Sequence, residues 1–313
     1  MRSKYLPAIA VLTCLTYVNK TSSQGCSDAG FCSVGALKHQ QIAAIDDSIK
    51  GKHQLSLVSS FGLGDEQVLV FTPALQYDYT ASKKLSLQAK LTAGYASGNL
   101  GSAAGLGDIF LTGSYLFPLK KSWTITTTAG VKLPLNQSNL ESDGRSFPMQ
   151  YQSSLGTIDA IGGITLSNNK WQFSTAIQQP LSGINRNHFL PVYWDKEEAA
   201  NYPSTNDFNR KGDVLLKLGR NFTVNKKLTI NAGLLNIFHL GKDKYIDANV
   251  SNKPISINGS EGLTLNLTGA CWWQIGNNLK LGITGGVPLV VRDVRPDGLT
   301  RSFVLSPQVG WLF

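Results

Sequence analysis

The sequence predicts an all-β fold, a transmembrane antiparallel up-and-down β-barrel of about 12 strands or, as the alternative, about 14. Apolar and polar residues alternate along short segments from about residue 53 onward. The connections between these segments are mostly short and long in turn, which is typical of barrels with short periplasmic turns and long extracellular loops. The last segment ends in two aromatic residues, Trp311 and Phe313, and aromatic residues favour the membrane interface.

Each expected strand has one apolar face. In the third, Leu85, Leu87 and Leu91 alternate with polar residues such as Ser86 and Gln88. A helix would spread these residues around its axis, whereas a strand sorts them onto opposite faces. The expected strands are 54–62, 68–79, 85–95, 107–117, 123–135, 155–166, 171–179, 213–222, 228–238, 263–275, 279–289 and 301–313.

The connections fall into two classes. Five are tight polar turns, A-S-K-K, L-K-K-S, S-N-N-K, V-N-K-K and G-N-N-L. The others are generally long, at 97–106, 136–154, 180–212, 240–262 and 290–301, and only the connection near 62–66 is short. An even strand count places both ends of the barrel on the periplasmic side, and we expect the last strand to pair with the first.

The N-terminal region predicts export. Arg2 and Lys4 precede an apolar run at 6–18, which is shorter than the roughly 20 residues of a spanning helix. We therefore expect a signal peptide at 1–23, a periplasmic segment or barrel plug at 24–52, and an outer-membrane barrel at 53–313. The expected location is the outer membrane of a Gram-negative bacterium.

Composition narrows the function further. Only 16% of the 313 residues are charged, and the net charge of +9 comes from lysines and arginines scattered along the chain. No basic helix or aromatic-interleaved patch indicates nucleic-acid binding. Cys26 and Cys32 could close a small disulfide in an oxidising compartment, and Cys271 is expected to be a small apolar filler in a strand. The spacing of histidines and cysteines predicts no metal site, and no cofactor is expected.

Residues 105–134 carry a further signal. G-L-G-D at 105–108 opens one strand, and another ends in G-V-K-L-P at 130–134. With L-G-T-I-D-A-I-G-G-I at 155–164, this pattern resembles the meta-pathway phenol-degradation family of outer-membrane proteins, itself distantly similar to the long-chain fatty-acid transporters. The resemblance covers about sixty residues well and implies an outer-membrane transporter without a defined substrate.

The polar faces of the expected strands supply candidate site residues. If the apolar faces meet lipid, the opposite faces line the lumen. We interpret the protein as a transporter or channel for small solutes, hydrophobic or aromatic ones among them, by passive or plug-gated diffusion. The alternative is a structural or surface-binding barrel with a filled lumen. The candidate lining residues are Gln88, Lys90, Asp108, Lys132, Lys217, Asn266, Lys280 and Gln308.

Two further features leave alternatives open. Pro73, Pro134, Pro288 and Pro307 lie inside expected strands and predict bends or bulges. The aromatic-rich connection 181–212 could fold over the barrel mouth as a lid or capture a hydrophobic ligand.

No catalytic motif is present, and we expect a protein that is not an enzyme. A membrane-embedded hydrolase with a serine and His239 on the outer face is a weaker alternative. The expected partners are outer-membrane lipid and the barrel-assembly machinery, which would recognise the strand ending in Phe313.

Overall fold

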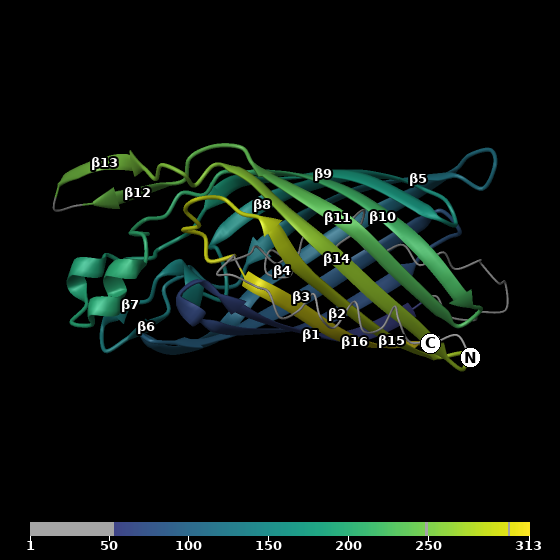
Figure 1. Cartoon of the computed structure of the whole chain (residues 1–313), viewed down its shortest axis with the longest axis horizontal. Helices are drawn as coiled ribbons and strands as arrows, with labels where there is room; N and C mark the ends of the chain where they lie inside the picture. The colour runs from purple at the N-terminus through teal and green to yellow at the C-terminus, as the bar shows by residue number, and fades with distance from the viewer. Residues whose placement is uncertain (1–52, 248–249, 300) are drawn as a thin grey trace, which may run out of the picture.

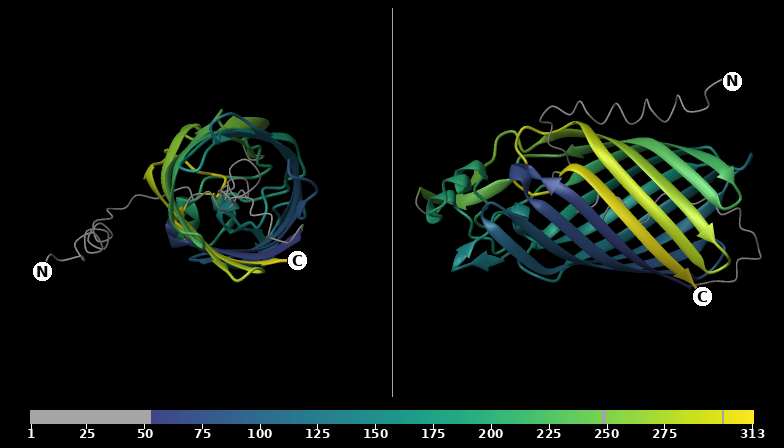
Figure 2. Two further views of the ribbon diagram at one scale, coloured as in Figure 1. Left: turned by 90° about the vertical axis from the view of Figure 1, so that its right-hand side faces the viewer. Right: turned by 60° about the horizontal axis from the view of Figure 1, so that its bottom comes forward.

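The computed structural model describes residues 53–247, 250–299 and 301–313. Twelve of the strands in these ranges close into one antiparallel barrel, in the order β1-β16-β15-β14-β11-β10-β9-β8-β5-β4-β3-β2 (Figure 1). Seen along its axis, the barrel is a ring of tilted strands (Figure 2). The barrel strands are β1 (His53–Gly64), β2 (Leu69–Thr80), β3 (Leu85–Gly98), β4 (Gly101–Pro118), β5 (Thr124–Pro134), β8 (Thr157–Ser167), β9 (Trp171–Gly183), β10 (Asp213–Asn225), β11 (Leu228–His239), β14 (Gly262–Ile275), β15 (Leu279–Val290) and β16 (Arg301–Leu312).

The predicted count of twelve strands is confirmed. Every strand expected from the alternation is found, with bounds that differ by a few residues. The signal peptide, the segment 24–52 and the Cys26–Cys32 disulfide lie outside the described residues, so these expectations stay predictions.

Burial follows the two-residue period of each strand. On β9, Gln172, Ser174 and Gln178 are buried, whereas Phe173 and Ile177 between them are exposed. A sheet closed on itself has one face inside and one outside, so the polar residues point inward and the apolar residues outward. This is the reverse of a water-soluble barrel.

The outer surface therefore carries large exposed apolar side chains on every strand. A soluble monomer rarely exposes so large a continuous apolar surface, whereas a lipid-facing barrel must. Among these side chains are Leu57, Leu75, Leu91, Leu111, Val131, Ile164, Phe173, Leu216, Ile230, Leu267, Ile283 and Val309. None of the helices in the described part of the chain is long and apolar enough to cross a membrane.

The last strand closes the barrel against the first, as expected. Leu55 pairs with Trp311, and Gln54 with Leu312. The backbone N–H of Phe313 donates to the carbonyl of His53 at 3.0 Å, and the His53 ring stacks on that of Phe313 with centroids 5.5 Å apart. Phe313 thus lies at the end of the barrel that holds the short turns.

The extracellular loops contain structure that the sequence did not predict. Two small hairpins, β6 (Glu141–Ser142) with β7 (Arg145–Ser146) and β12 (Lys244–Asp247) with β13 (Ser251–Ser256), extend beyond the barrel (Figure 1). Short 3-10 helices η4 (Asp65–Gln67), η5 (Met149–Tyr151), η6 (Pro191–Tyr193) and η7 (Glu197–Asn201) lie in the same loops.

The expectation of a long connection at 97–106 is wrong. β3 and β4 continue to Gly98 and Gly101, which pair with each other and leave only Asn99 and Leu100 as the connection. The small residues at 101–106 hide the alternation because alanine and glycine do not distinguish an apolar face from a polar one.

The expected irregularities occur at three of the prolines. The β1–β16 pairs pass from Val58–Gln308 directly to Phe61–Leu305, which leaves a gap at Pro307. The β2–β3 pairs pass from Phe71–Tyr95 directly to Ala74–Thr92, which leaves a gap at Pro73. The register of β14 against β15 shifts beside Pro288. Proline has no N–H to donate to the neighbouring strand, which explains the three interruptions.

Candidate functional site

A buried ion pair joins two neighbouring strands on the inner wall, near their extracellular ends. Lys132 of β5 and Asp159 of β8 are direct register partners, and Lys132 Nζ lies 2.9 Å from Asp159 Oδ2. Lys132 Nζ also donates to Thr157 Oγ1 at 2.9 Å, and the Gln178 amide of β9 donates to Asp159. Both charged side chains are fully buried, so their charges are neutralised by each other rather than by water.

Asp108 extends this polar wall toward the extracellular loops. Its carboxylate accepts a hydrogen bond of 2.5 Å from the hydroxyl of Ser154, which belongs to the loop between β5 and β8. Thr92 of β3 fixes the backbone of Asp108 by accepting from its N–H at 2.8 Å. Asp108 therefore joins an inward strand position to a loop that reaches the barrel mouth.

The predicted lining residues all occupy inward positions. Six of the eight, Gln88, Lys90, Asp108, Lys132, Lys217 and Asn266, are buried. Lys280 and Gln308 are half-buried and share the inward face with Gly310 and Ser306, respectively. Of the eight, only Asp108 and Lys132 belong to the connected wall just described. A role of the eight in lining a conduit stays a prediction.

Part of the inner wall is apolar, which the sequence analysis missed. Six buried residues on β4, β8, β9, β10 and β11 form one cluster, the inner apolar band. The available signal was a break in alternation, because Phe110 lies among Ile109 and Leu111 in one uninterrupted apolar run. Such a run does not show by itself which face each residue takes. The inner apolar band consists of Phe110, Ile161, Ala176, Leu215, Leu235 and Ile237.

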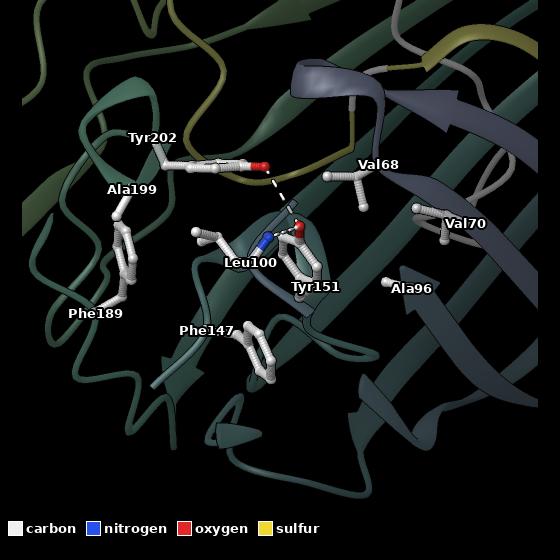
Figure 3. Packing of buried hydrophobic residues seen from close by; sticks show 9 residues of the cluster. All are labelled: Val68, Val70, Ala96, Leu100, Phe147, Tyr151, Phe189, Ala199 and Tyr202. Carbon is white, nitrogen blue, oxygen red and sulfur yellow. Dashed lines mark hydrogen bonds between the residues drawn. The ribbon is translucent and has the colours of Figure 1, made fainter. Parts of the chain in front are cut away.

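The extracellular mouth is narrowed by loops that pack on the barrel edge. A buried cluster, the mouth cluster, joins the loops 135–156 and 184–212 to β2 and to the β3–β4 hairpin (Figure 3). It consists of Val68, Val70, Ala96, Leu100, Phe147, Tyr151, Phe189, Ala199 and Tyr202.

Two tyrosines hold this cluster by both stacking and hydrogen bonds. The Tyr151 ring stacks on Phe147 with centroids 4.9 Å apart, and its hydroxyl accepts from the N–H of Leu100 at 3.2 Å. The Tyr202 hydroxyl donates to Asn99 Oδ1 at 2.7 Å. Burial raises the pKa of both tyrosines, so both are neutral at physiological pH. The loop 184–212 therefore folds over the mouth, as one of the two sequence interpretations expected.

A second cluster at the mouth is built of charges, the rim network. Arg292 Nη2 and Arg210 Nε contact Asp297 Oδ2 at 2.8 and 3.2 Å, and Arg210 Nη2 donates to Asp213. The rim network is buried and ties the loops before β10, after β11 and before β16 to one another. Its members are Arg210, Asp213, His239, Asp243, Arg292 and Asp297.

His239 is occupied by this network. Its Nδ1 lies 2.7 Å from Asp213 Oδ1, and its Nε2 lies 2.8 Å from Asp243 Oδ1. Carboxylates only accept hydrogen bonds, so both ring nitrogens act as donors and neither can take a proton from a serine. His239 also points inward and is buried, so the hydrolase interpretation with a base on the outer face is wrong for this residue.

A small open cleft lies between the inserted loops and the wall of β2 and β3. Tyr151 and Met149 line it on the loop side, and Thr72 and Thr92 on the wall side. Because Asp108 also lines it, the cleft connects the mouth cluster with the polar wall. Within the described ranges, no group of three or more histidine, cysteine or acidic residues could hold a metal ion.

No protein-family profile and no curated protein sequence matches the chain. Among solved structures, the NanC porin aligns with 83% of this chain and 98% of its own at a TM-score of 0.46 and 11% identity. The KdgM porin in complex with disordered oligogalacturonate aligns with 83% of this chain and 99% of its own, at a TM-score of 0.45 and 7% identity. The translocator domain of the autotransporter NalP from Neisseria meningitidis aligns with 86% of this chain and 92% of its own, at a TM-score of 0.42 and 10% identity. Scores below 0.5 assign neither a family nor a function.

The class of protein follows from the geometry of the chain itself. A closed barrel with an even number of antiparallel strands, an apolar exterior and a polar interior is the architecture of a bacterial outer-membrane protein. The short turns then face the periplasm, and the loops that carry the mouth cluster and the rim network face outward.

Proposed function

We propose that the protein is a passive channel of the outer membrane for small solutes that combine a polar or charged group with an apolar or aromatic part. The observation that carries this proposal is the two-sided inner wall. Lys132, Asp159 and Asp108 offer charges and hydrogen bonds, and the inner apolar band presents hydrocarbon on neighbouring strands. The proposed transport involves no covalent chemistry.

The proposed route begins at the cleft beneath the mouth cluster. It passes Asp108 and Ser154, continues along the Lys132–Asp159 pair, and leaves between the periplasmic turns. A twelve-stranded barrel lies between filled eight-stranded barrels and open sixteen-stranded porins. We therefore expect a narrow lumen that selects small solutes by contact with the wall.

Opening of the mouth would then control transport. The loops of the mouth cluster are held by stacking, by hydrogen bonds of Tyr151 and Tyr202, and by the buried charges of the rim network. These side-chain contacts are not part of the backbone hydrogen bonds that join the barrel strands. Movement of the loops could therefore widen the mouth without disturbing any barrel strand.

A structural barrel with a filled lumen is the second candidate. The complete burial of Lys132 and Asp159 favours it, because a water-filled pore would leave such charges hydrated. The two candidates differ in ion conduction. We expect the purified chain, folded in planar bilayers, to give discrete single-channel steps. Electrically silent bilayers that contain folded barrels would instead support the filled lumen.

A matched pair of anions tests the solute class. Benzenesulfonate and methanesulfonate carry the same charged group and differ by an aromatic ring. Reversal potentials under gradients of each salt give their relative permeability. A lumen with a working apolar band should admit the aromatic anion at least as well as the smaller one. A strong preference for methanesulfonate would exclude the proposed aromatic selectivity while leaving a channel in place.

The resemblance to the phenol-degradation family is compatible with this proposal, and aromatic compounds are the solutes it suggests. Growth of a deletion strain on a panel of aromatic and fatty compounds would test it directly. Unchanged growth on every compound would count against these substrates.

A further inference from the structure

The periplasmic turns contain only one sign of charge. Residues 81–84, 119–123, 168–170, 226–227 and 276–278 contain seven lysines and no aspartate or glutamate. In the described ranges, Asp78 is the only acidic residue within five positions of these turns. Asp78 accepts hydrogen bonds from Gln76 and Gln88, at 2.7 Å each, on the inner wall. The turns at this end therefore carry a net positive charge.

One part of this surface is organised for a ligand at the level of the lipid headgroups. Arg220 of β10 is exposed on the outer face, with its Cζ 5.1 Å from the ring centroid of Trp171 and 5.2 Å from that of Phe222. Both rings lie within cation–π distance of the guanidinium. Within the described ranges, no hydrogen bond or ion pair involves its N–H groups, which are donors in a planar fork.

The aromatic patch continues sideways from Arg220. Trp171 stacks on Phe173 with centroids 6.3 Å apart, and Phe173 lies 6.4 Å from Trp123. Tryptophan on the outer face of a barrel marks the boundary between hydrocarbon and headgroups. Arg220 is therefore placed where the phosphates of the inner leaflet lie.

Three lysines lie in the two turns at this end of β9 and β10. Lys170 directly precedes Trp171, and its carbonyl accepts from the N–H of Asn221, next to Arg220, at 2.7 Å. Lys226 and Lys227 form the next turn along β10. All three are exposed, and none forms an ion pair with a carboxylate in the part of the chain that the structure describes.

We propose that Arg220, Lys170, Lys226 and Lys227 form a binding surface for the phosphate headgroup of an anionic phospholipid in the inner leaflet of the outer membrane. The guanidinium supplies directed hydrogen bonds to phosphate oxygens, and the lysines supply attraction that does not depend on orientation. The acyl chains would lie against Phe222, Phe173 and the apolar belt above them. The site would anchor the barrel at a fixed depth and orientation.

The test is lipid retention by the folded full-length chain. Nanodiscs with equal amounts of phosphatidylglycerol and phosphatidylcholine provide both lipids, and native mass spectrometry counts the lipids that stay bound after release. We expect phosphatidylglycerol to exceed phosphatidylcholine by at least about fivefold, the effect of a single basic residue near an anionic surface. Equal retention of the two lipids by the unaltered chain would overturn the proposal.

The key variant combines Lys170→Gln, Arg220→Gln, Lys226→Gln and Lys227→Gln. Its matched control combines Arg186→Gln, Lys196→Gln, Lys242→Gln and Lys253→Gln, which removes the same charge from exposed extracellular positions. Electrophoretic mobility with and without heating verifies that each barrel is folded. We expect the first variant to lose the preference and the control to keep it.

A preference that survives in the first variant, or falls equally in both, would contradict a local site. Arg220→Lys keeps the charge but loses the planar guanidinium and its directed hydrogen bonds, and we expect an intermediate preference. Because conductance is not measured here, the outcome is independent of the proposed channel function.

Discussion

Lys132 and Asp159 are direct partners in the β5–β8 register and form an ion pair of 2.9 Å with both side chains fully buried. The pair lies on the inner wall, next to Gln178 and Thr157. A buried pair adds little net stability over apolar residues, but loss of one member leaves an uncompensated charge. The pair therefore defines the polar half of the lumen wall and makes it sensitive to single substitutions.

The first prediction concerns this pair. Lys132→Met should lower the free energy of unfolding by about 3–5 kcal/mol, because Asp159 remains buried without its cation. Urea unfolding in lipid vesicles, followed by tryptophan fluorescence, measures the loss. The double variant Lys132→Met with Asp159→Leu should recover most of it. Arg145→Met, at an exposed pair with Asp195, should cost less than about 1 kcal/mol. Equal losses of unfolding free energy in Lys132→Met and Arg145→Met would contradict this prediction.

The second prediction concerns the mouth cluster. Tyr151→Ala removes a buried ring stacked on Phe147 and should increase the open probability of the channel several-fold, because large-to-small changes at such sites cost about 3–5 kcal/mol. Single-channel recording measures the effect, and Tyr151→Phe separates the ring from the hydroxyl. Tyr115→Phe, on the lipid-facing surface, is the control. Unchanged open times in Tyr151→Ala would show that these loops do not limit transport.

The third prediction concerns the inner apolar band. Phe110→Ala should reduce the permeability of benzenesulfonate relative to methanesulfonate by roughly tenfold, since the lost apolar contact is worth about 1–3 kcal/mol. Leu111→Ala on the same strand faces lipid and provides the matched control. Simple widening of the lumen would instead raise the permeability of benzenesulfonate relative to methanesulfonate. Such a rise would argue against contact between the solute and the inner apolar band.

The fourth prediction concerns acid stability of the rim network. Burial alone would raise the pKa of Asp297, but Arg292 and Arg210 outweigh it and hold that pKa below its ordinary value of 3.8. A depressed folded-state pKa contributes stability above pH 3.8, and this contribution disappears as pH falls through the folded-state pKa.

The protection factors of the backbone amides in residues 291–299, which correct for the intrinsic pH dependence of hydrogen exchange, should therefore stay high down to about pH 4 and fall below it. Asp297→Asn should show faster exchange already at neutral pH and a weaker acid dependence. The exposed Asp195→Asn should behave like the unaltered chain. An identical pH profile in Asp297→Asn would assign the acid sensitivity to other carboxylates.

The fifth prediction concerns the N-terminal segment, which lies outside the described residues. If residues 24–52 act as a plug, their deletion behind an intact 1–23 leader should raise conductance. Replacement by a Gly-Ser segment of equal length controls for the altered spacing. Equal conductance in all three proteins would leave the plug interpretation without support and favour a periplasmic tether.

Much of the barrel was predictable because alternation is a local property. The residues of β9 and β16 show their faces within a few positions, and each polar turn marks where a strand ends. The same logic placed Lys132 and Asp108 on the inner wall. It failed at 101–106, where small residues carry no contrast, and at Phe110, where an apolar residue faces inward.

The sequence by itself indicated a barrel of about twelve strands, the alternating faces of most strands and the cationic periplasmic turns, since each depends on residues close together in the chain. Only the tertiary structure decided which partners meet. Asp159 reaches Lys132 through strand register, and Tyr202 reaches Asn99 through loop folding across more than a hundred residues. Such contacts depend on closure of the whole barrel, because no periodicity within one strand encodes the neighbour that a side chain will face.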